Sequence, residues 1–178
     1  MIGYPGVMLK SQDVVVLLKV AGRPGWTIAP VAAELGMSAS AVHRSVERAI
    51  EGHLMTARGR DVNANALEEL LVHATRYLFP ARLQGPARGL PTAWSAPPLA
   101  TRLARLDDDP LVWPDPEEAS RGIALEPIHP SVPRAARGDG VLHERLALVD
   151  ALRAGGPRVR GEAAAALHEH LATVASSP

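Results

Sequence analysis

Apolar residues recur at helical spacing in several parts of the chain and predict a mainly α-helical fold. Residues 14–20 are a run of valines, leucines and one lysine, preceded by Ser11 and Asp13 and followed by Gly22. β-branched residues favour strands, but the serine, the acid in the first turn and the terminal glycine favour a helix here. Residues 141–153 and 159–174 carry apolar side chains three and four apart. We expect these two segments to form a C-terminal helical hairpin.

The stretch from Trp26 to Met55 has the pattern of two helices joined by a tight turn and followed by a strand. Gly36 stands where the first helix must end in a left-handed backbone conformation. Thr27 and Ser38 are placed as N-caps of the two helices. Several apolar positions can meet between the helices: Val31, Leu35, Met37, Val42 and Val46. This spacing predicts a helix-turn-helix, and an ordinary helical hairpin with a glycine corner is the alternative.

Two short strands, residues 54–56 and 60–62, are expected to follow and to form a wing around Gly59. Arg58 and Arg60 flank that glycine, which suits a wing that lies against a phosphate backbone or reaches into a minor groove. The alternative is a solvated hairpin with charged edges. Asn65 with Glu68 resembles a capping box, and the helix it opens should end before Pro80.

Residues 80–140 have a different composition, because eleven of the sixteen prolines fall there and exclude long helices. Such a segment would be disordered if it were also polar. It contains Trp94, Trp113 and the apolar run 123–125, which are unusual in a solvated linker. We expect an ordered, loop-rich segment with one or two short strands and a short helix over 99–106.

Residues 11–79 resemble the winged helix-turn-helix domains of bacterial transcription regulators, and the run 32–48 is especially similar to the reading head of MarR-type regulators. The resemblance implies a mainly α fold with a winged helix-turn-helix DNA-binding domain over 1–79. The proline-rich connecting segment would then cover 80–140, and the hairpin in 141–178 would serve dimerisation or partner binding. The sequence departs from the family where a glycine often precedes the first wing strand, since His53 takes that place and Gly52 comes one residue earlier.

The resemblance also implies which residues contact double-stranded DNA. The second helix would lie in the major groove, and the wing would flank it. Arg44 could hold a guanine edge or a phosphate, the Ala39 methyl could contact thymine, and Glu47 could accept from cytosine. The alternative is a solvated charged face. The complete set of expected DNA-binding residues is Ser38, Ala39, Ser40, His43, Arg44, Glu47, Arg48, Arg58 and Arg60.

Net charge weakens this picture. The chain has 19 Lys and Arg against 19 Asp and Glu, whereas DNA-binding domains usually carry a basic surface. Between His43 and Arg60 four arginines stand against two glutamates. So small a basic footprint predicts weak binding by one copy, and therefore a homodimer, in keeping with a dimeric repressor that reads two half-sites. A protein-interaction module with a winged-helix fold that does not bind DNA is the alternative.

Other chemistry finds little support. The sequence has no cysteine, no glycine-rich phosphate loop, no nucleophile elbow and no zinc-hydrolase helix motif. His168 and His170 lie two apart, about 200° around a helix, and cannot hold one metal ion from one face. We therefore expect no catalytic, cofactor-binding or metal-binding residues. Without a signal peptide or a membrane-spanning run, we expect a cytoplasmic protein with no membrane partner.

Residues 91–99 and 124–133 are similar to segments of bacterial proteins with a regulator-like N-terminus, some of them encoded beside nucleotidyltransferase-type toxins. This resemblance implies a regulator of its own operon, an antitoxin-like role and a protein partner encoded nearby.

Overall fold

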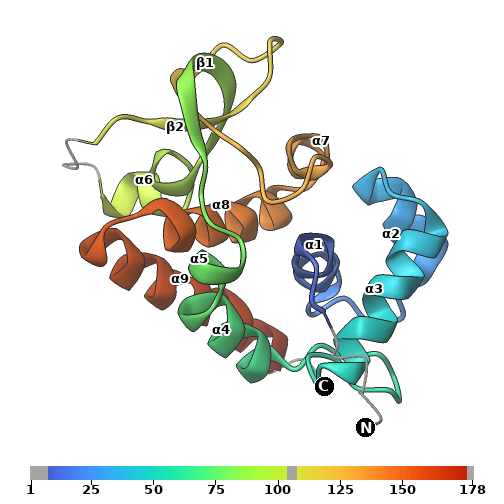
Figure 1. Cartoon of the computed structure of the whole chain (residues 1–178). Helices are drawn as coiled ribbons and strands as arrows, with labels where there is room; N and C mark the ends of the chain where they lie inside the picture. Colours follow the sequence, from blue (N-terminus) through green and yellow to red (C-terminus); the bar gives the residue numbers. More distant parts are fainter. Residues whose placement is uncertain (1–7, 104–107, 176–178) are drawn as a thin grey trace, which may run out of the picture.

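The N-terminal part of the chain is helical, as its spacing predicts. In this computed structural model, α1 (Ser11–Val20), α2 (Ile28–Leu35) and α3 (Ala39–Glu51) follow one another through short turns. They are followed by α4 (Ala64–His73) and α5 (Thr75–Leu78), which end before Pro80. The structure describes residues 8–103 and 108–175 (Figure 1). It is mainly helical, with one small three-stranded sheet.

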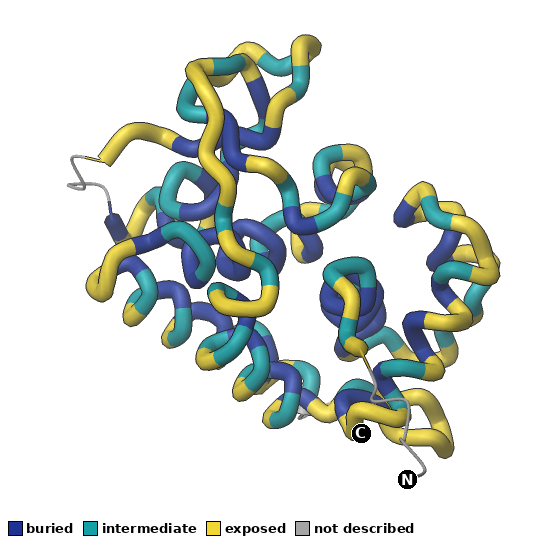
Figure 2. Tube along the Cα trace, viewed as in Figure 1, coloured by how far each residue is buried: buried dark blue, intermediate teal, exposed yellow. Residues whose placement is uncertain are grey.

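Helix α1 lies between the α2–α3 pair and the C-terminal helices (Figure 1). Every residue from Asp13 to Leu18 is buried (Figure 2). This explains why a run of valines and leucines without polar interruptions forms a helix here: a helix surrounded by protein has no exposed face that needs polar residues.

Helix α8 (Gly140–Ala154) is the second buried helix. All residues from Arg145 to Leu152 are buried, and α8 packs against α1, α5, α7, α9 and the sheet. Helix α9 (Pro157–Ala175) covers α8 and α4. The apolar side chains spaced three and four apart in this pair form its buried face: Leu142, Leu146, Val149, Leu152, Ala163, Ala166, Leu167 and Leu171. One hydrophobic cluster therefore runs through residues of all three expected segments, 1–79, 80–140 and 141–178.

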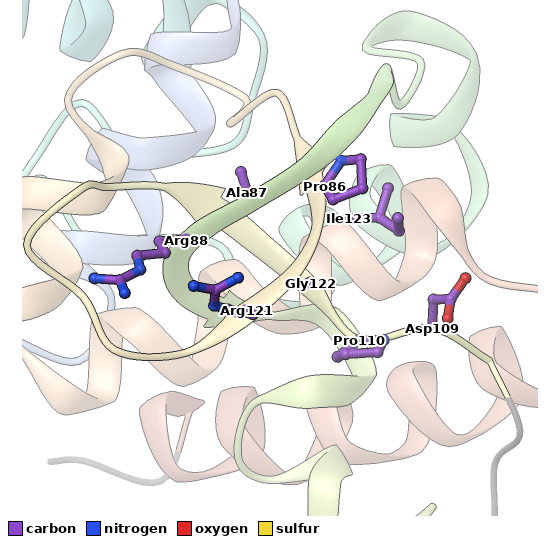
Figure 3. A pocket seen from close by; sticks show the side chains of 8 residues that line it. All are labelled: Pro86, Ala87, Arg88, Asp109, Pro110, Arg121, Gly122 and Ile123. Carbon is purple, nitrogen blue, oxygen red and sulfur yellow. The ribbon is translucent and has the colours of Figure 1, made fainter.

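The sheet is a closed barrel of three strands. β1 (Leu83–Thr92) pairs antiparallel with β2 (Leu111–Pro114) and with β3 (Arg121–Leu125), while β2 and β3 pair in parallel. Figure 3 shows part of the β1–β3 ladder, in which Arg88 stands opposite Arg121. Two glycines let the strands approach this closely. A Cβ on Gly89 would stand 2.0 Å from the Trp113 carbonyl oxygen, and one on Gly122 would stand 2.3 Å from that of Pro110.

A buried carboxylate joins this barrel to α8. Asp150 is 1% exposed and accepts hydrogen bonds from Trp113 Nε1 at 2.6 Å and Thr92 Oγ1 at 2.9 Å. Arg153 Nη1 donates to its other oxygen at 2.5 Å. Burial raises the pKa of Asp150, while the charge of Arg153 acts in the opposite direction. The three donors satisfy a group that would otherwise be costly to bury.

The expected wing strands 54–56 and 60–62 are present only in part. Only an isolated bridge between Met55 and Val62 forms. The Thr56 hydroxyl donates to the Arg58 carbonyl at 2.8 Å and accepts from the Asp61 N–H at 3.0 Å, so a side chain closes much of this loop. Gly59 and Arg60 are both left-handed, with φ of 87° and 57°, which ends the ladder after one bridge.

Two local expectations near the wing are also settled by the structure. Asn63, and not Asn65, caps α4, because its side-chain oxygen accepts from the Ala66 N–H at 3.2 Å. His53 has φ of 58° and supplies the left-handed residue after α3. His53 thus occupies a position where a glycine would relieve backbone strain.

The proline-rich segment contains three strands instead of one or two. β1 passes through Pro86 and Pro91, and its register shifts between Leu83 and Pro86. The segment also holds η1 (Ala93–Ser95), α6 (Leu99–Arg102) and α7 (Val132–Arg137), of which α7 was not expected. Of the helix expected over 99–106, α6 forms Leu99–Arg102 and ends at Leu103, and 104–106 lie outside the described residues. Residues 1–7 also lie outside them.

The close approach at Gly89 predicts a large cost for one methyl group. Gly89→Ala should lower the free energy of unfolding by about 2–3 kcal/mol, because the Trp113 carbonyl must move and the β1–β2 pairing must open. Gly85→Ala on the same strand is the matched control, since nothing lies within 4 Å of its Cβ position. Urea unfolding of both variants measures the difference, and equal stabilities would contradict the packing described.

Candidate nucleic-acid interface

The junction between α2 and α3 is built by two residues. Gly36 ends α2 with φ of 65°, the left-handed conformation that glycine adopts without strain. Ser38 begins α3, and its hydroxyl accepts from the Ala41 N–H at 3.1 Å. The inner face of α3 then packs against α1 and α2 through residues that are all buried: Val42, Ser45, Val46 and Ala49.

The outer face of α3 is free of the rest of the described chain. Its residues are exposed (Figure 2) and include six of the nine expected DNA-binding positions: Ser38, Ala39, Ser40, His43, Arg44 and Glu47. His43 Nδ1 lies 3.5 Å from Glu47 Oε2, one turn along the helix. Within residues 8–103 and 108–175, no side-chain hydrogen bond or ion pair engages Arg44. This face therefore offers hydroxyl, imidazole, guanidinium and carboxylate groups side by side.

Arg48 belongs to a different environment. Its Nε and Nη2 donate to the two oxygens of Asp13 at 2.8 and 2.6 Å, and Nη2 also reaches the Ser45 hydroxyl. The Asp13 side chain is completely buried and that of Arg48 is 16% exposed. This two-point pair fastens α3 to α1 and is the structural role of Arg48.

Arg58 and Arg60 lie in the hairpin that follows α3, and both are exposed. The guanidinium of Arg60 stands 5.8 Å from the ring centre of Trp26, and Trp26 Nε1 donates to the Arg60 carbonyl at 3.4 Å. The contact joins the hairpin to the segment that leads into α2. Of the nine expected positions, eight are thus exposed around the α2–α3 unit, and Arg48 is held inside it.

Arg134 is a candidate that the sequence did not reveal. It lies on α7, which packs against α2, and its Nη1 stands 3.3 Å from where a Cβ on Gly36 would be. Arg134 is exposed, and no acidic side chain in the described parts of the chain pairs with it. It adds a positive charge at the beginning of α3 from a residue almost 100 positions away in sequence.

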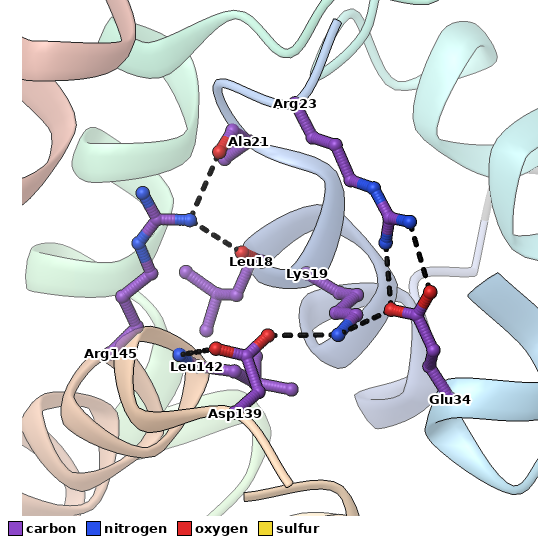
Figure 4. Close-up of polar contacts among 8 residues, drawn as sticks. All are labelled: Leu18, Lys19, Ala21, Arg23, Glu34, Asp139, Leu142 and Arg145. Atoms are coloured by element: carbon purple, nitrogen blue, oxygen red, sulfur yellow. Dashed lines mark hydrogen bonds and ion pairs between the residues drawn. The ribbon is translucent and has the colours of Figure 1, made fainter. Parts of the chain in front are cut away.

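A polar network fixes the α2–α3 unit to the C-terminal half (Figure 4). Lys19 Nζ on α1 lies 2.7 Å from Glu34 Oε2 on α2 and 2.8 Å from Asp139 Oδ2 at the start of α8. Arg23 also binds Glu34. Arg145 on α8 donates to the carbonyls of Leu18 and Ala21, where α1 ends.

These contacts set the pKa values of the network. Hydrogen bonds from Arg23 and then Lys19 lower the pKa of Glu34 to about 2. Burial alone would raise the pKa of Asp139, but hydrogen bonds from Lys19 and the Leu142 N–H outweigh it and lower that pKa. Burial likewise acts against the charge of Lys19, yet its two acidic partners raise its pKa overall.

Other chemistry remains sparse in the described residues. Among them, no three histidine or acidic side chains gather as a metal site, and no helix is long and apolar enough to cross a membrane. His129 Nδ1 and Ser131 Oγ lie 2.9 Å apart, but Nδ1 also accepts the backbone N–H of Ser131. The contact closes the turn before α7. Burial lowers the pKa of His129.

Comparisons of the chain with protein families, with curated proteins and with solved structures found no match.

The Asp13–Arg48 pair predicts that two arginines on one helix differ in their effect on stability. Arg48→Ala should lower the free energy of unfolding by about 3–5 kcal/mol, because it leaves a buried carboxylate without its partner. Arg44→Ala, four residues away and exposed, should change it by less than about 0.5 kcal/mol. Chemical denaturation followed by circular dichroism compares the two, and a mild Arg48→Ala would remove the anchoring role.

The lowered pKa values of Glu34 and Asp139 predict loss of stability in acid. A carboxyl whose pKa is lower in the folded state contributes stability above its unfolded pKa, and that stability is lost as the pH falls through the folded pKa. The free energy of unfolding should therefore decrease progressively as the pH falls from 5 to about 2. In Glu34→Gln this acid slope should be shallower than in the wild type, as measured by thermal melting across the range. An unchanged slope would exclude Glu34 as its source.

Proposed function

We propose that this protein is a sequence-specific DNA-binding transcriptional regulator built on a winged helix-turn-helix of MarR-like type. The observation that carries the proposal is the outer face of α3. The helix follows a tight turn at Gly36 and begins at the capping residue Ser38, and the side chains of this outer face are exposed. A helix of 13 residues is about 20 Å long, and a major groove about 12 Å wide admits it.

In this proposal α3 enters the major groove by its N-terminal part. Arg44 grips a base edge or a phosphate, and Ser40 and His43 bind beside it. The hairpin with Arg58 and Arg60 acts as a short wing along the backbone, its angle held by the Trp26 contact. Arg134 contacts a phosphate next to the start of α3, since it stands beside Gly36. Arg48 holds α3 in place and does not touch DNA.

Electrostatics supports a dimer. The formal net charge is zero, and the exposed arginines around the α2–α3 unit are few, so one copy neutralises few phosphates. Two copies related by a two-fold axis would double the contacts and read half-sites about 34–36 Å apart. We propose a dimeric repressor that binds near its own gene, in an antitoxin-like arrangement with a partner encoded nearby.

Neutral charge favours one competing function, a protein-interaction module that keeps the same shape. Glu47 and Glu51 lie on α3 among its basic residues, and such a mixed face also suits a protein partner. The two functions differ in their response to salt. DNA binding should weaken on a log–log slope of about −0.9 for each phosphate contact. Flat dependence, or no retardation of any DNA at low salt, would favour the protein partner.

The assigned roles of Arg44 and Arg134 predict different losses. Arg44→Ala should cost about 1–3 kcal/mol of binding and relax the preference at one base position. Arg134→Ala should weaken binding to all sequences alike and reduce the salt slope by about one. Fluorescence anisotropy on the selected site and on single-base variants measures both. An Arg44→Ala loss below about 0.5 kcal/mol would remove its role as a base reader.

A further inference from the structure

A second feature lies on the barrel, where the sheet forms a cavity of about 450 Å³. Strands β1 and β3 supply Pro86, Ala87, Arg88, Arg121, Gly122 and Ile123, and the chain before β2 supplies Asp109 and Pro110. The two arginines lie close together at one side of the labelled residues, while Asp109 lies at the other (Figure 3). The cavity thus has a cationic end, an apolar middle and an acidic end.

The cationic end brings two like charges to neighbouring positions of the sheet. Arg88 and Arg121 are direct partners in the antiparallel β1–β3 ladder. Like charges directly opposite each other on antiparallel strands are destabilising. In the part of the chain that the structure describes, neither guanidinium has an ion pair or a side-chain hydrogen bond. Both side chains are exposed, so water and salt weaken the repulsion between them, and an anion bound between the two guanidinium groups would remove it.

Acidic residues do lie nearby, but they are bound elsewhere. The loop between β2 and β3 touches β1, since the Asp115 N–H donates to the Arg88 carbonyl at 3.0 Å. Its three acids, Asp115, Glu117 and Glu118, all pair with Arg137 of α7. None of these three carboxylates therefore neutralises Arg88, although their loop contacts the Arg88 backbone.

The backbone around the arginines is held firmly. Gly122 lies against the Pro110 carbonyl, with no room for a Cβ, and the Ile123 N–H donates to that same carbonyl at 2.8 Å. Pro86 and Pro110 further restrict the chain on either side of the cavity. Such rigidity reduces the entropy lost when a ligand binds.

We propose that Arg88 and Arg121 together bind the oxyanion head, phosphate or carboxylate, of a small molecule whose apolar part lies over Pro86, Pro110 and Ile123. Guanidinium groups bind both anions through paired hydrogen bonds. Asp109 repels a second anion and so fixes which end of the ligand points toward the arginines. The site does not depend on the DNA-binding proposal, because none of its residues belongs to α2, α3 or the hairpin after α3.

Titration calorimetry of the full chain at low ionic strength tests the site with three probes: inorganic phosphate, butyl phosphate and butyrate. Saturable binding of either butyl compound is expected, and butyl phosphate should bind more tightly than inorganic phosphate because of its apolar part. The comparison of butyl phosphate with butyrate identifies the preferred head. Arg88→Gln and Arg121→Gln should each raise the Kd at least tenfold, whereas Arg82→Gln, an exposed arginine just before β1, should leave it unchanged.

A second measurement needs no ligand. If the two arginines repel each other, Arg121→Gln should melt at the same temperature as the wild type or higher in low salt, and the wild type should gain thermal stability when a butyl probe is added. Absence of saturable binding of every probe up to roughly 50 mM would overturn the proposal. So would equal losses in Arg82→Gln and Arg121→Gln. Loss of DNA affinity in Arg88→Gln without any probe binding would make the pair a contact to nucleic-acid phosphate instead.

Discussion

The buried helix α1 is the constraint on which the arrangement of the structure depends. At its first turn, Asp13 holds Arg48 of α3 through two hydrogen bonds. Near the last turn of α1, Lys19 forms ion pairs with α2 and with the start of α8. Arg145 of α8 donates hydrogen bonds to the backbone carbonyls at the end of α1. Between these points the helix is buried on all sides. A helix fixed at both ends and around its surface sets the position of α3 relative to the rest of the protein.

This constraint shapes how the proposed function would work. Contacts connect the barrel to α3 through Thr92, Asp150, α8 and α1. The same packing brings α7 beside Gly36 and adds Arg134 to the face. The C-terminal hairpin, expected to serve dimerisation or partner binding, packs against α1 and the barrel of its own chain. A dimer must therefore use surface that is exposed in this fold.

Local signals predicted the elements but not their long-range contacts. Gly36, Ser38 and the spacing of 142–152 were sufficient for α2, α3 and α8, because turns and caps depend on a few neighbouring residues. The three strands were missed in part because proline is a poor strand former, and the closed barrel compensates through glycine contacts between distant residues. Eight of the nine candidate site residues are exposed as expected. Arg48 is not exposed because it pairs with Asp13, 35 positions away in the sequence, and local patterns do not predict such a contact. The position of Arg134 beside Gly36 was missed because it is also a contact between residues far apart in the sequence.

The most direct test of the central proposal is selection of fragments of the source organism's genomic DNA by the full-length protein, with an Arg44→Glu variant selected in parallel. The account predicts that the wild type enriches one short sequence with two-fold symmetry, next to its own gene, and that the variant does not. Equal recovery by both proteins, or no enrichment of any sequence, would contradict DNA reading by the outer face of α3.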